Sequence, residues 1–525
     1  MERKLLIAAG ALPLALTLSM QNASARQAGV NSKGGTSGGD RPNIIFFLVD
    51  DMGWQDTSVP FWTERTKYND IYETPNMERL AAQGMLFTQA YASSVSSPSR
   101  CSMLTGANAA RHRVTNWTLQ KDTPPDMQSD VLSLPDWNYN GIAQVPGTNN
   151  TFLAKSFVQY LRDGGYHTIH CGKAHWGAID TPGENPCHFG FETNISGHAA
   201  GGLASYLGET RYGHDKDGNP VSLMAVPGLE KYWDTDTFVT EALTREAIRA
   251  LDKAREYNQP FYLYMSHYAI HIPIDRDARY FEKYKAKGLS DKEAAYAGLI
   301  EGMDKSLGDL MDWLEENGEA DNTIIIFMGD NGGYATGGGW RDEPLYTQNS
   351  PLKCGKGSAY EGGIREPLIV YWPGVTDGGT RCDSYVAAED LFPTILAMAG
   401  IRPAGAPQRI DGKSFVPLLK GKGDPSKGRS LYWNYPNLWG ETGPGIGASC
   451  TVRKGDWKLI YFYETGQKEL YNIAEDIGED RNLAAERPDI VKKLSSDLGR
   501  YLRRAGAQRP SFKATGQPCP WPDEL

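Results

Sequence analysis

The sequence has few cysteines and histidines, and it lacks long hydrophobic runs. Its 525 residues include 7 Cys and 9 His. The cysteines are widely spaced, which excludes both a disulfide-rich scaffold and a zinc site of ordinary spacing. No apolar run approaches the roughly 18 to 20 residues that a transmembrane helix needs. We therefore expect a globular protein with a sizeable core and no transmembrane segment.

Positive charge is also scarce. Lys and Arg number 54 against 64 Asp and Glu, for a formal net charge of -10 and a pI near 5.5. This balance argues against nucleic acid and against anionic membrane surfaces as general partners. An anionic substrate would need a locally basic pocket.

The N-terminal residues have the pattern of an export signal. Arg3 and Lys4 precede an apolar run, and Ala23-Ser24-Ala25 offers small residues for cleavage. We expect residues 1–25 to be a signal peptide and the Gly- and Ser-rich residues 26–40 to be a flexible linker. Folded structure should begin at Arg41.

Two folded parts are expected after the linker. From 41 to 420, short apolar runs alternate with helical patterns, which predicts an α/β domain whose mostly parallel central sheet is flanked by helices. Residues 421–525 are predicted to form a smaller C-terminal domain. Short strands at 430–433, 458–463 and 468–471 would make an antiparallel sheet there, and a helix over 488–504 would pack on it. This domain is interpreted as structural support.

Two buried strands are predicted to end in oxygen ligands. The run Asn43–Val49 leads into Asp50 and Asp51, and the run from Thr323 leads into Asp330 and Asn331. Carboxyl ends of parallel strands meet at one edge of a sheet. Carboxylate and amide oxygens favour calcium or magnesium over zinc. Either pair alone could equally cap a helix or shape a turn, but together they predict a metal site.

A serine-rich segment, residues 93–106, contains Ser96 just before a predicted helix. Pro98 can set the first turn of a helix that runs to Leu104, so Ser96 would face the helix N-terminus, where free N–H groups favour anions. Such capping loops are common, and Ser96 alone indicates little. Cys101 in the same segment is interpreted as a buried apolar residue without a catalytic role.

The residues that follow Ser96, and the spacing between them, make Ser96 a specific candidate for a functional residue. Ser96-Ser-Pro-Ser-Arg100 followed by Leu-Thr-Gly106 resembles the signature of the type I, formylglycine-dependent sulfatases of the alkaline phosphatase superfamily. The resemblance continues, in the order of that family, through Asp50-Asp51, Gly172–Gly177, His271 within 269–273, Asp330-Asn331, Gly355-Lys356-Gly357 and Tyr360–Pro367. It covers the whole large domain and implies an alkaline-phosphatase-like fold.

The resemblance implies a complete site. The metal ligands would be Asp50, Asp51, Asp330, Asn331 and the modified Ser96, with calcium the usual ion and magnesium possible. The catalytic residues would be Ser96, Arg100, Lys173, His175, His271 and Lys356. In this scheme His271, supported by Lys356, protonates the departing alcohol, and His175 accepts a proton from the hydrated formylglycine. His267 is predicted to be a pocket residue only.

Serine at the modified position departs from the commoner cysteine. The resemblance associates serine with bacteria whose sulfatases are matured by an anaerobic radical enzyme. It therefore implies that maturation enzyme as a partner, and a periplasmic or cell-surface location. Formylglycine can release sulfate through its second hydroxyl, whereas unmodified serine would leave a sulfate ester.

The function expected from these features is hydrolysis of sulfate monoesters at the ends of sulfated carbohydrates. Galactose or N-acetylgalactosamine sulfate is the expected substrate, with aryl or steroid sulfates as the alternative. Residues 177–206 with His188 and His198, and the loop 337–349, are predicted pocket walls. Trp117 or Trp340 could stack on a sugar. Two rival functions are a phosphatase or phosphodiesterase of the same superfamily and a non-catalytic sulfated-glycan-binding protein.

Overall fold

The computed structural model describes residues 41–334, 339–342, 347–440 and 443–525. The predicted signal peptide and linker, residues 1–40, and part of the predicted pocket loop 337–349 lie outside the described residues. Residues Arg41 to Leu525 form a single unit. Among the residues described, no helix is long and apolar enough to span a membrane.

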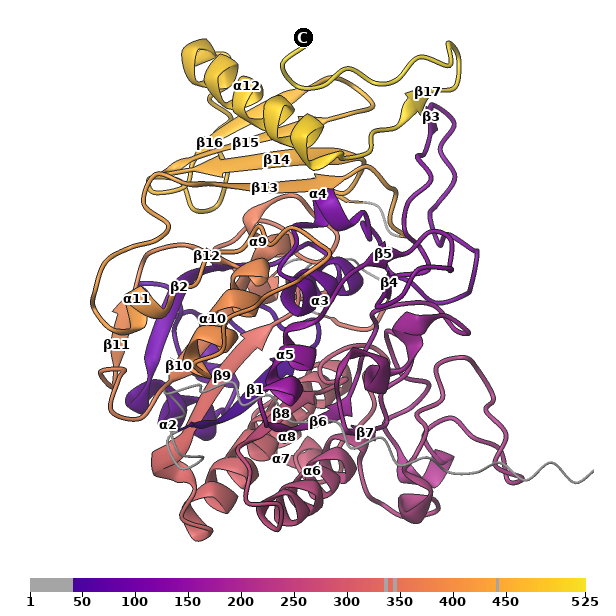
Figure 1. Cartoon of the computed structure of the whole chain (residues 1–525), viewed down its shortest axis with the longest axis vertical. Coiled ribbons are helices and arrows are strands. Elements are labelled where there is room, and N and C mark those ends of the chain that lie inside the picture. Colours follow the sequence, from indigo (N-terminus) through magenta and orange to yellow (C-terminus); the bar gives the residue numbers. More distant parts are fainter. Residues whose placement is uncertain (1–40, 335–338, 343–346, 441–442) are drawn as a thin grey trace, which may run out of the picture. The chain divides into compact units, whose positions relative to one another are not determined.

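A large sheet crosses this unit (Figure 1). Its strands run in the order β11-β2-β10-β9-β1-β8-β6-β7, and β12 pairs with β2. The strands are β1 (Asn43–Val49), β2 (Met85–Tyr91), β6 (His167–Gly172), β7 (Thr193–Ile195), β8 (Phe261–Ser266), β9 (Thr323–Gly329), β10 (Arg365–Tyr371), β11 (Thr380–Cys382) and β12 (Val386–Ala387). Only β10 pairs antiparallel with its neighbours, β9 and β2. The prediction of a mostly parallel central sheet is confirmed.

Helices cover both faces of the sheet. Along β1, Ile45, Phe47 and Val49 belong to one core cluster and the alternate residues to another. One face is packed by α2 (Pro75–Gln83), α6 (Val239–Arg255), α7 (Phe281–Ala286) and α8 (Asp291–Glu316); the other by α3 (Ser96–Thr105), α5 (Phe157–Asp163) and α10 (Leu391–Met398). Burial on both faces explains why β1 and β9 are continuous apolar runs instead of alternating ones.

Shorter elements connect these layers. They are α1 (Lys67–Ile71), α4 (Ala109–His112), α9 (Glu361–Ile364) and α11 (Val416–Leu419), with the short strands β3 (Leu132–Ser133), β4 (Ile142–Ala143), β5 (Phe152–Leu153) and β17 (Ser511–Phe512). Helix α2 starts after Thr74 with Pro75 as its first residue and ends before Gly84, the usual positions of proline and glycine at helix ends.

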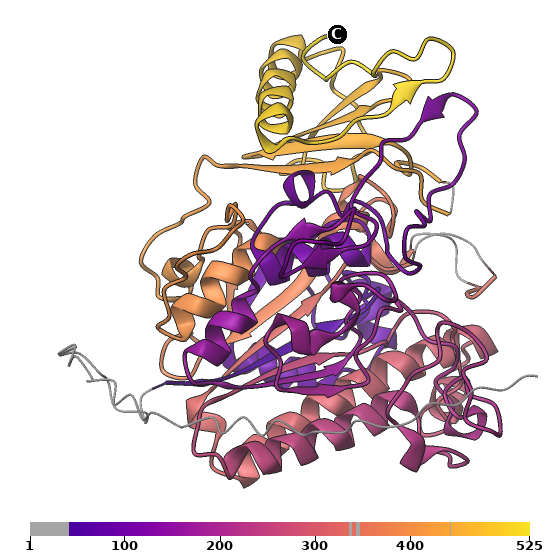
Figure 2. The ribbon, with the colours of Figure 1, turned by 45° about the vertical axis from the view of Figure 1, so that its right-hand side comes forward.

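The C-terminal part is a second, antiparallel sheet. It consists of β13 (Ser430–Tyr435), β14 (Ser449–Lys454), β15 (Trp457–Phe462) and β16 (Lys468–Asn472), in that order. Helix α12 (Pro488–Ala505) lies on it (Figure 2). Leu494, Leu498 and Leu502 recur every four residues and share a buried cluster with Val452 and Leu459. The three predicted strands and the helix are confirmed, whereas β14 was not predicted.

Buried charges join the antiparallel sheet to the rest of the protein. Lys458 of β15 lies 3.0 Å from Glu361 in α9 and 2.9 Å from Glu479, and all three side chains are buried. Glu361 also accepts a hydrogen bond from the Tyr91 hydroxyl at 2.7 Å. Glu361 also lies near Arg365 and Arg453, so removal of Lys458 would chiefly leave the buried Glu479 without its cationic partner. The boundary near residue 420 stays a prediction.

Replacement of this cation should therefore destabilise the whole fold. We expect Lys458→Met to lower the free energy of unfolding by about 3 to 5 kcal/mol, the usual effect of breaking a buried ion pair. Lys493→Met, at an exposed position of α12, is the matched control and should change it by less than about 0.5 kcal/mol. Chemical denaturation of both variants measures the difference. Equal stability of the two would contradict the role given to Lys458.

Candidate active site

The candidate site lies where four adjacent parallel strands end. Asp50 and Asp51 follow β1, Asp330 follows β9, Lys173 follows β6, and His271 comes shortly after β8. In the sheet these strands stand in the order β9-β1-β8-β6. Their carboxyl ends therefore open on the same edge, as in other open α/β sheets. The structure brings together residues that are up to 305 positions apart, such as Asp51 and Lys356.

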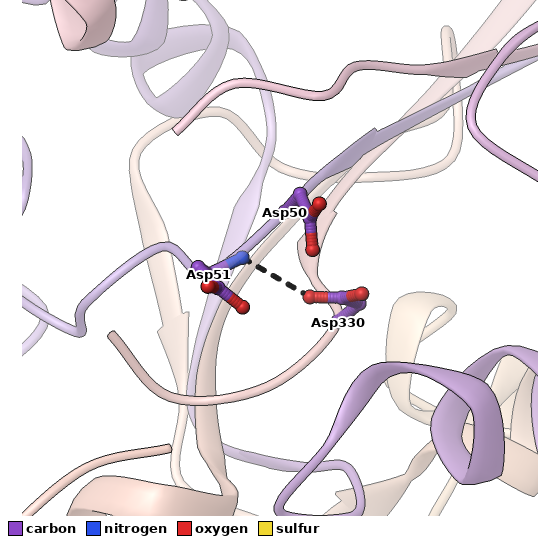
Figure 3. Close-up of side chains that lie close together, drawn as sticks. All are labelled: Asp50, Asp51 and Asp330. Atoms are coloured by element: carbon purple, nitrogen blue, oxygen red, sulfur yellow. Dashed lines mark hydrogen bonds between the residues drawn. The ribbon is translucent and has the colours of Figure 1, made fainter. Parts of the chain in front are cut away.

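Three buried carboxylates form the centre of the site (Figure 3). Oxygens of Asp50, Asp51 and Asp330 lie within 4.8 Å of one another, and each residue is at most 1% exposed. Burial raises the pKa of Asp50 to about 8 against the effect of the Lys173 ammonium, and the neighbouring carboxylates add to the rise. Burial acts on Asp330 as well, but Arg100, Lys173 and Lys356 lower the pKa of Asp330 below its usual range.

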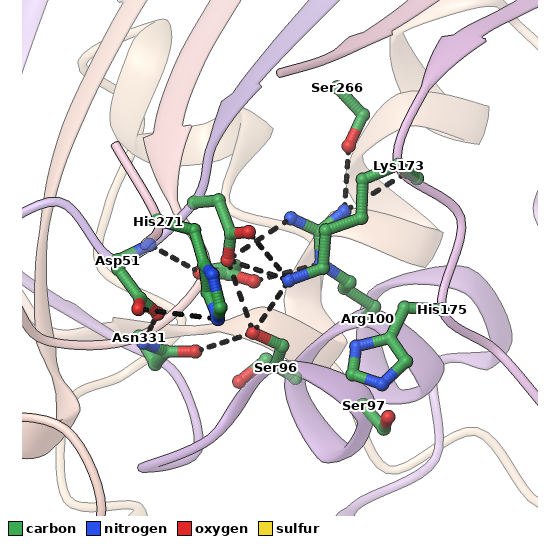
Figure 4. Close-up of polar contacts among 12 residues, drawn as sticks. Asp51, Ser96, Ser97, Arg100, Lys173, His175, Ser266, His271 and Asn331 are labelled. Carbon is green, nitrogen blue, oxygen red and sulfur yellow. Dashed lines mark hydrogen bonds and ion pairs between the residues drawn. The ribbon is translucent and has the colours of Figure 1, made fainter. Parts of the chain in front are cut away.

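Ser96 is the first residue of α3 and lies against this centre (Figure 4). The helix begins at Ser96, two residues before Pro98. Its Oγ donates to Asn331 Oδ1 at 2.9 Å, lies 3.2 Å from Asp50 Oδ1, and accepts from Lys173 Nζ at 3.1 Å. The Ser96 hydroxyl thus contacts two of the predicted metal ligands and also the ammonium group of Lys173.

Three cations surround the carboxylates. Lys173 Nζ lies 2.7 Å from both oxygens of Asp50, and Lys356 Nζ lies 2.7 Å from both oxygens of Asp51. Arg100 donates from Nε to Asp330 Oδ2 at 2.8 Å and from Nη1 to Ser266 Oγ at 2.6 Å. Each carboxylate therefore has its own cationic partner, and Arg100 is held in place by a second contact.

The two histidines are held through one ring nitrogen each. His175 Nε2 lies 3.0 Å from the carbonyl of Thr118, and His271 Nδ1 lies 2.7 Å from the carbonyl of Ile272. A carbonyl only accepts, so these nitrogens carry the proton. His175 Nδ1 has no hydrogen-bond partner among the described residues, and His271 Nε2 lies 3.7 Å from Asp51 Oδ2. Burial, and then Lys356, lowers the pKa of His271 to about 3.

The donor set fits a hard divalent cation. Asp50, Asp51, Asp330, Asn331 and Ser96 all present oxygen, and the carboxylate cluster includes neither His nor Cys. Calcium and magnesium prefer such oxygens. A cation held there would offset the like charges that raise the pKa of Asp50. Asp51 has a left-handed backbone, with φ of 57°, a conformation that costs free energy and concentrates at functional sites.

A pocket opens above Ser96. It encloses about 790 Å³ including its open mouth, and Ser96, His175, His271 and Lys356 are part of its lining. Its walls are apolar and aromatic, with Trp117, Met224, Ile272, Tyr334 and Trp439. Of the predicted pocket walls, the segment 177–206 contributes Gly201 and Gly202.

One prediction about the surroundings, that for His267, was wrong. His267 is fully buried and its Nε2 lies 2.8 Å from Ser306 Oγ on α8, so it is not a pocket residue. His188, His198 and Trp340 are not among the residues that line the pocket, whereas Trp117 is. Cys101 is buried and unpaired, like the other buried cysteines, and lies outside this lining.

Sequence reasoning missed three residues near the site. Trp439 lines the pocket although it belongs to the C-terminal part, which was interpreted as support only. Tyr334 lines it too, and the Asp-Asn-Gly-Gly motif directly before it was the available signal. Glu366 of β10 is buried, and neither of its carboxyl oxygens has a hydrogen-bond partner among the described residues. Burial raises the pKa of Glu366 well above its usual range.

The site thus combines buried acidic residues at the strand ends, which could hold a metal ion, with a serine at a helix N-terminus. The chain belongs to the sulfatase family, because the model of the Sulfatase family matches residues 42–401. A second model, described as N-sulphoglucosamine sulphohydrolase, C-terminal, matches residues 355–505. The protein is thus a sulfuric ester hydrolase with the predicted fold.

Relatives of known name agree with this family. A sulfatase of Formosa agariphila is 28% identical, over 92% of both chains. The N-acetylgalactosamine-6-sulfatase of Homo sapiens is 28% identical, over 93% of this chain and 90% of that protein. The solved structure of Ps i-CgsB in complex with k-i-k-neocarrahexaose is 25% identical with a TM-score of 0.69, over 88% of this chain and 93% of that one.

The raised pKa of Asp50 predicts how pH acts on the metal-free protein. A folded-state pKa of about 8 against an ordinary value of 3.8 means that Asp50 contributes stability below pH 3.8, which is lost as the pH rises towards 8. In EDTA, the melting temperature of the wild type should therefore fall relative to that of Asp50→Asn as the pH rises from 4 to 8. Thermal unfolding of both proteins measures this difference.

Calcium serves as the control for that measurement. An ion that binds only the folded state stabilises it, so calcium held by these carboxylates would stabilise the wild type and remove the advantage of Asp50→Asn. A constant difference between the two proteins across this pH range, with and without calcium, would rule out the electrostatic account of the site.

Proposed function

We propose that the protein hydrolyses sulfate monoesters of terminal sugars, with Ser96 converted to formylglycine and a divalent cation, calcium, bound beside it. The observation that carries the proposal is the position of Ser96 Oγ. It contacts Asn331, Asp50 and Lys173 at 2.9 to 3.2 Å, and it opens on the pocket that contains His175, His271 and Lys356.

Asp50, Asp51, Asp330, Asn331 and the residue at 96 would hold the cation. Bound there, it would supply positive charge beside the sulfate oxygens and lower the pKa of a hydroxyl at position 96. Formylglycine would supply, as its hydrate, two hydroxyls on one carbon, one to attack sulfur and one through which sulfate can leave.

The protein's own cations would hold the sulfate. Lys356 lines the pocket, and the buried Lys173 contacts Ser96 Oγ from beneath that lining, so a sulfate above Ser96 would lie near two fixed ammonium groups. Such preorganised charge acts strongly in a site from which water is excluded. Arg100 is fully buried behind them and bonds to Asp330, so its role is to fix that carboxylate and to add positive charge.

The two histidines would move protons at opposite ends of the sulfate. His175 Nδ1 has no hydrogen-bond partner among the described residues, and His175 lines the same pocket as Ser96, which suits acceptance of a proton from position 96. His271 would donate from Nε2 to the departing sugar oxygen. Its pKa of about 3 leaves it neutral alone, but a sulfate close to it would raise that pKa by adding negative charge.

The proposed substrate is a sulfated galactose or N-acetylgalactosamine at the end of a glycan. The named activity of the human relative and the oligosaccharide bound to Ps i-CgsB support a sulfated carbohydrate. A pocket with an open mouth and aromatic walls suits one terminal sugar ring. A serine-type site further implies an anaerobic maturation enzyme and a bacterial periplasmic or cell-surface location.

The rival phosphatase function finds less support. Enzymes of that type hold two zinc ions with additional histidine ligands. Among the described residues the one cluster of three or more candidate ligands is formed by aspartates alone. A non-catalytic role would not account for Lys173, which contacts Ser96, or for Lys356, which lines the same pocket. We therefore favour catalysis.

Two substitutions test the proton and charge roles. We expect His271→Ala and Lys356→Ala each to lower kcat about 100- to 10,000-fold, the range of general acid or base catalysis, while circular dichroism shows that both variants keep the fold of the wild type. Release of sulfate from sulfated sugars is the measurement. Turnover close to that of the wild type in either variant would refute the assignment.

Conversion of Ser96 can be tested without turnover. Oxidation of serine to formylglycine removes two hydrogens, so a peptide that spans Ser96 should lose about 2 Da when the protein is produced with an anaerobic maturation enzyme. Ser96→Ala, produced in the same way, should show no such loss and no activity. An active protein whose Ser96 peptide keeps its unmodified mass would exclude the formylglycine mechanism.

A further inference from the structure

The pocket has a charged floor and uncharged walls. Lys356 and the two histidines lie at the floor next to Ser96, whereas the wall residues are aromatic, aliphatic or glycine. The internal stretches outside the described residues are 335–338, 343–346 and 441–442, and their sequences contain no lysine or arginine. Positive charge is thus confined to the floor.

Trp439 is the fixed part of the wall. It lies in the connection between β13 and β14 and is 8% exposed. The Tyr334 ring meets it edge to face, with centroids 6.4 Å apart and an angle of 82°. Lys356 Nζ lies 5.8 Å from its ring centroid. Edge-to-face and cation–π contacts both stabilise such an arrangement, so the indole is oriented before any ligand arrives.

Gly357 makes this position of the indole possible. A Cβ at residue 357 would lie 2.2 Å from Trp439 Cε3, and the residue has φ of +82°. Only glycine allows both the close approach and the backbone conformation. The segment that carries Lys356 is therefore shaped to receive Trp439.

A second set of contacts holds Trp117, another residue of the wall. Tyr435 and Val95 share a cluster with Trp439, against which Trp117 packs. The Tyr435 hydroxyl donates to Asn116 Oδ1 at 3.0 Å, and the same oxygen accepts from the Trp117 backbone N–H at 3.0 Å. The residues at 117, 334 and 439 thus come from three distant segments and line one pocket.

We propose that Trp439, with Trp117 and Tyr334, is a sugar-stacking wall that selects a terminal ring whose only negative charge is the sulfate to be removed. This inference rests on the proposed function. The apolar C–H face of a pyranose can pack on an aromatic ring, whereas a second sulfate or a carboxylate would lose water against a wall without a cation. Trp439 is accordingly a specificity-determining residue contributed by the C-terminal part.

Binding to Ser96→Ala protein tests the selection without the need for turnover. The probes are the 4-sulfate, the 6-sulfate and the 4,6-disulfate of N-acetylgalactosamine, measured by isothermal titration calorimetry. We expect the better monosulfate to bind at least about tenfold more tightly than the disulfate. Equal or tighter binding of the disulfate would overturn the inference.

Variants of the wall test its contacts in the same background. Trp439→Ala should weaken binding of the monosulfate about 10- to 100-fold, the effect of truncating a well-packed aromatic contact, and Trp439→Phe should retain most of it. Inorganic sulfate, which meets only the floor, should bind Trp439→Ala as it binds the parent. Trp340→Ala is the matched control, because Trp340 is 36% exposed and lies outside the pocket lining. Unchanged monosulfate binding in Trp439→Ala would overturn the inference.

These measurements distinguish a failure of the proposed hydrolysis from a failure of the proposed stacking wall. If matured wild-type protein releases no sulfate from either monosulfate, yet the binding pattern holds, the proposed hydrolysis fails and the stacking wall stands. If sulfate is released but the disulfate is cleaved as well as the monosulfates, the wall fails and the hydrolysis stands.

Discussion

The structure of the site depends on the compensation of three carboxylates in a small volume that water does not reach. Asp50, Asp51 and Asp330 lie within 4.8 Å of one another, and such a group of like charges is unfavourable in a protein interior. Lys173, Lys356 and Arg100 each contact one of them. Cations and carboxylates are equal in number, so a bound divalent ion would leave the site positive, as an anionic substrate requires.

The central sheet provides this arrangement. Strands β9, β1, β8 and β6 are neighbours, and each leads at its carboxyl end into a residue of the site. Parallel pairing fixes the spacing of these ends to that of adjacent strands, which is why carboxylates distant in sequence converge. Helix α3 brings Ser96 to the same edge with its N-terminus, where free backbone N–H groups favour negative charge. The remaining residues of the pocket come from loops.

The sequence allowed prediction of the parts that depend on local pattern. The apolar runs of β1 and β9 and the acidic residues after them predicted strands and ligands together, because burial and sheet direction leave few other arrangements. His267 was misplaced because its spacing from His271 resembles that of pocket neighbours. Just past β8, its side chain packs against Phe47 in the core on one face of the sheet.

Trp439 could not be predicted, because its position depends on how the β13–β14 connection docks on a distant loop. The contact needs Gly357 to lack a side chain and Tyr334 to present its ring edge, and neither requirement leaves a periodic pattern. The indole lies over the segment that carries Lys356, but Lys356 keeps its own ion pair with Asp51. Truncation of the indole therefore leaves the sulfate end of the pocket in place, so sugar recognition can change in this fold while the groups that meet sulfate stay the same.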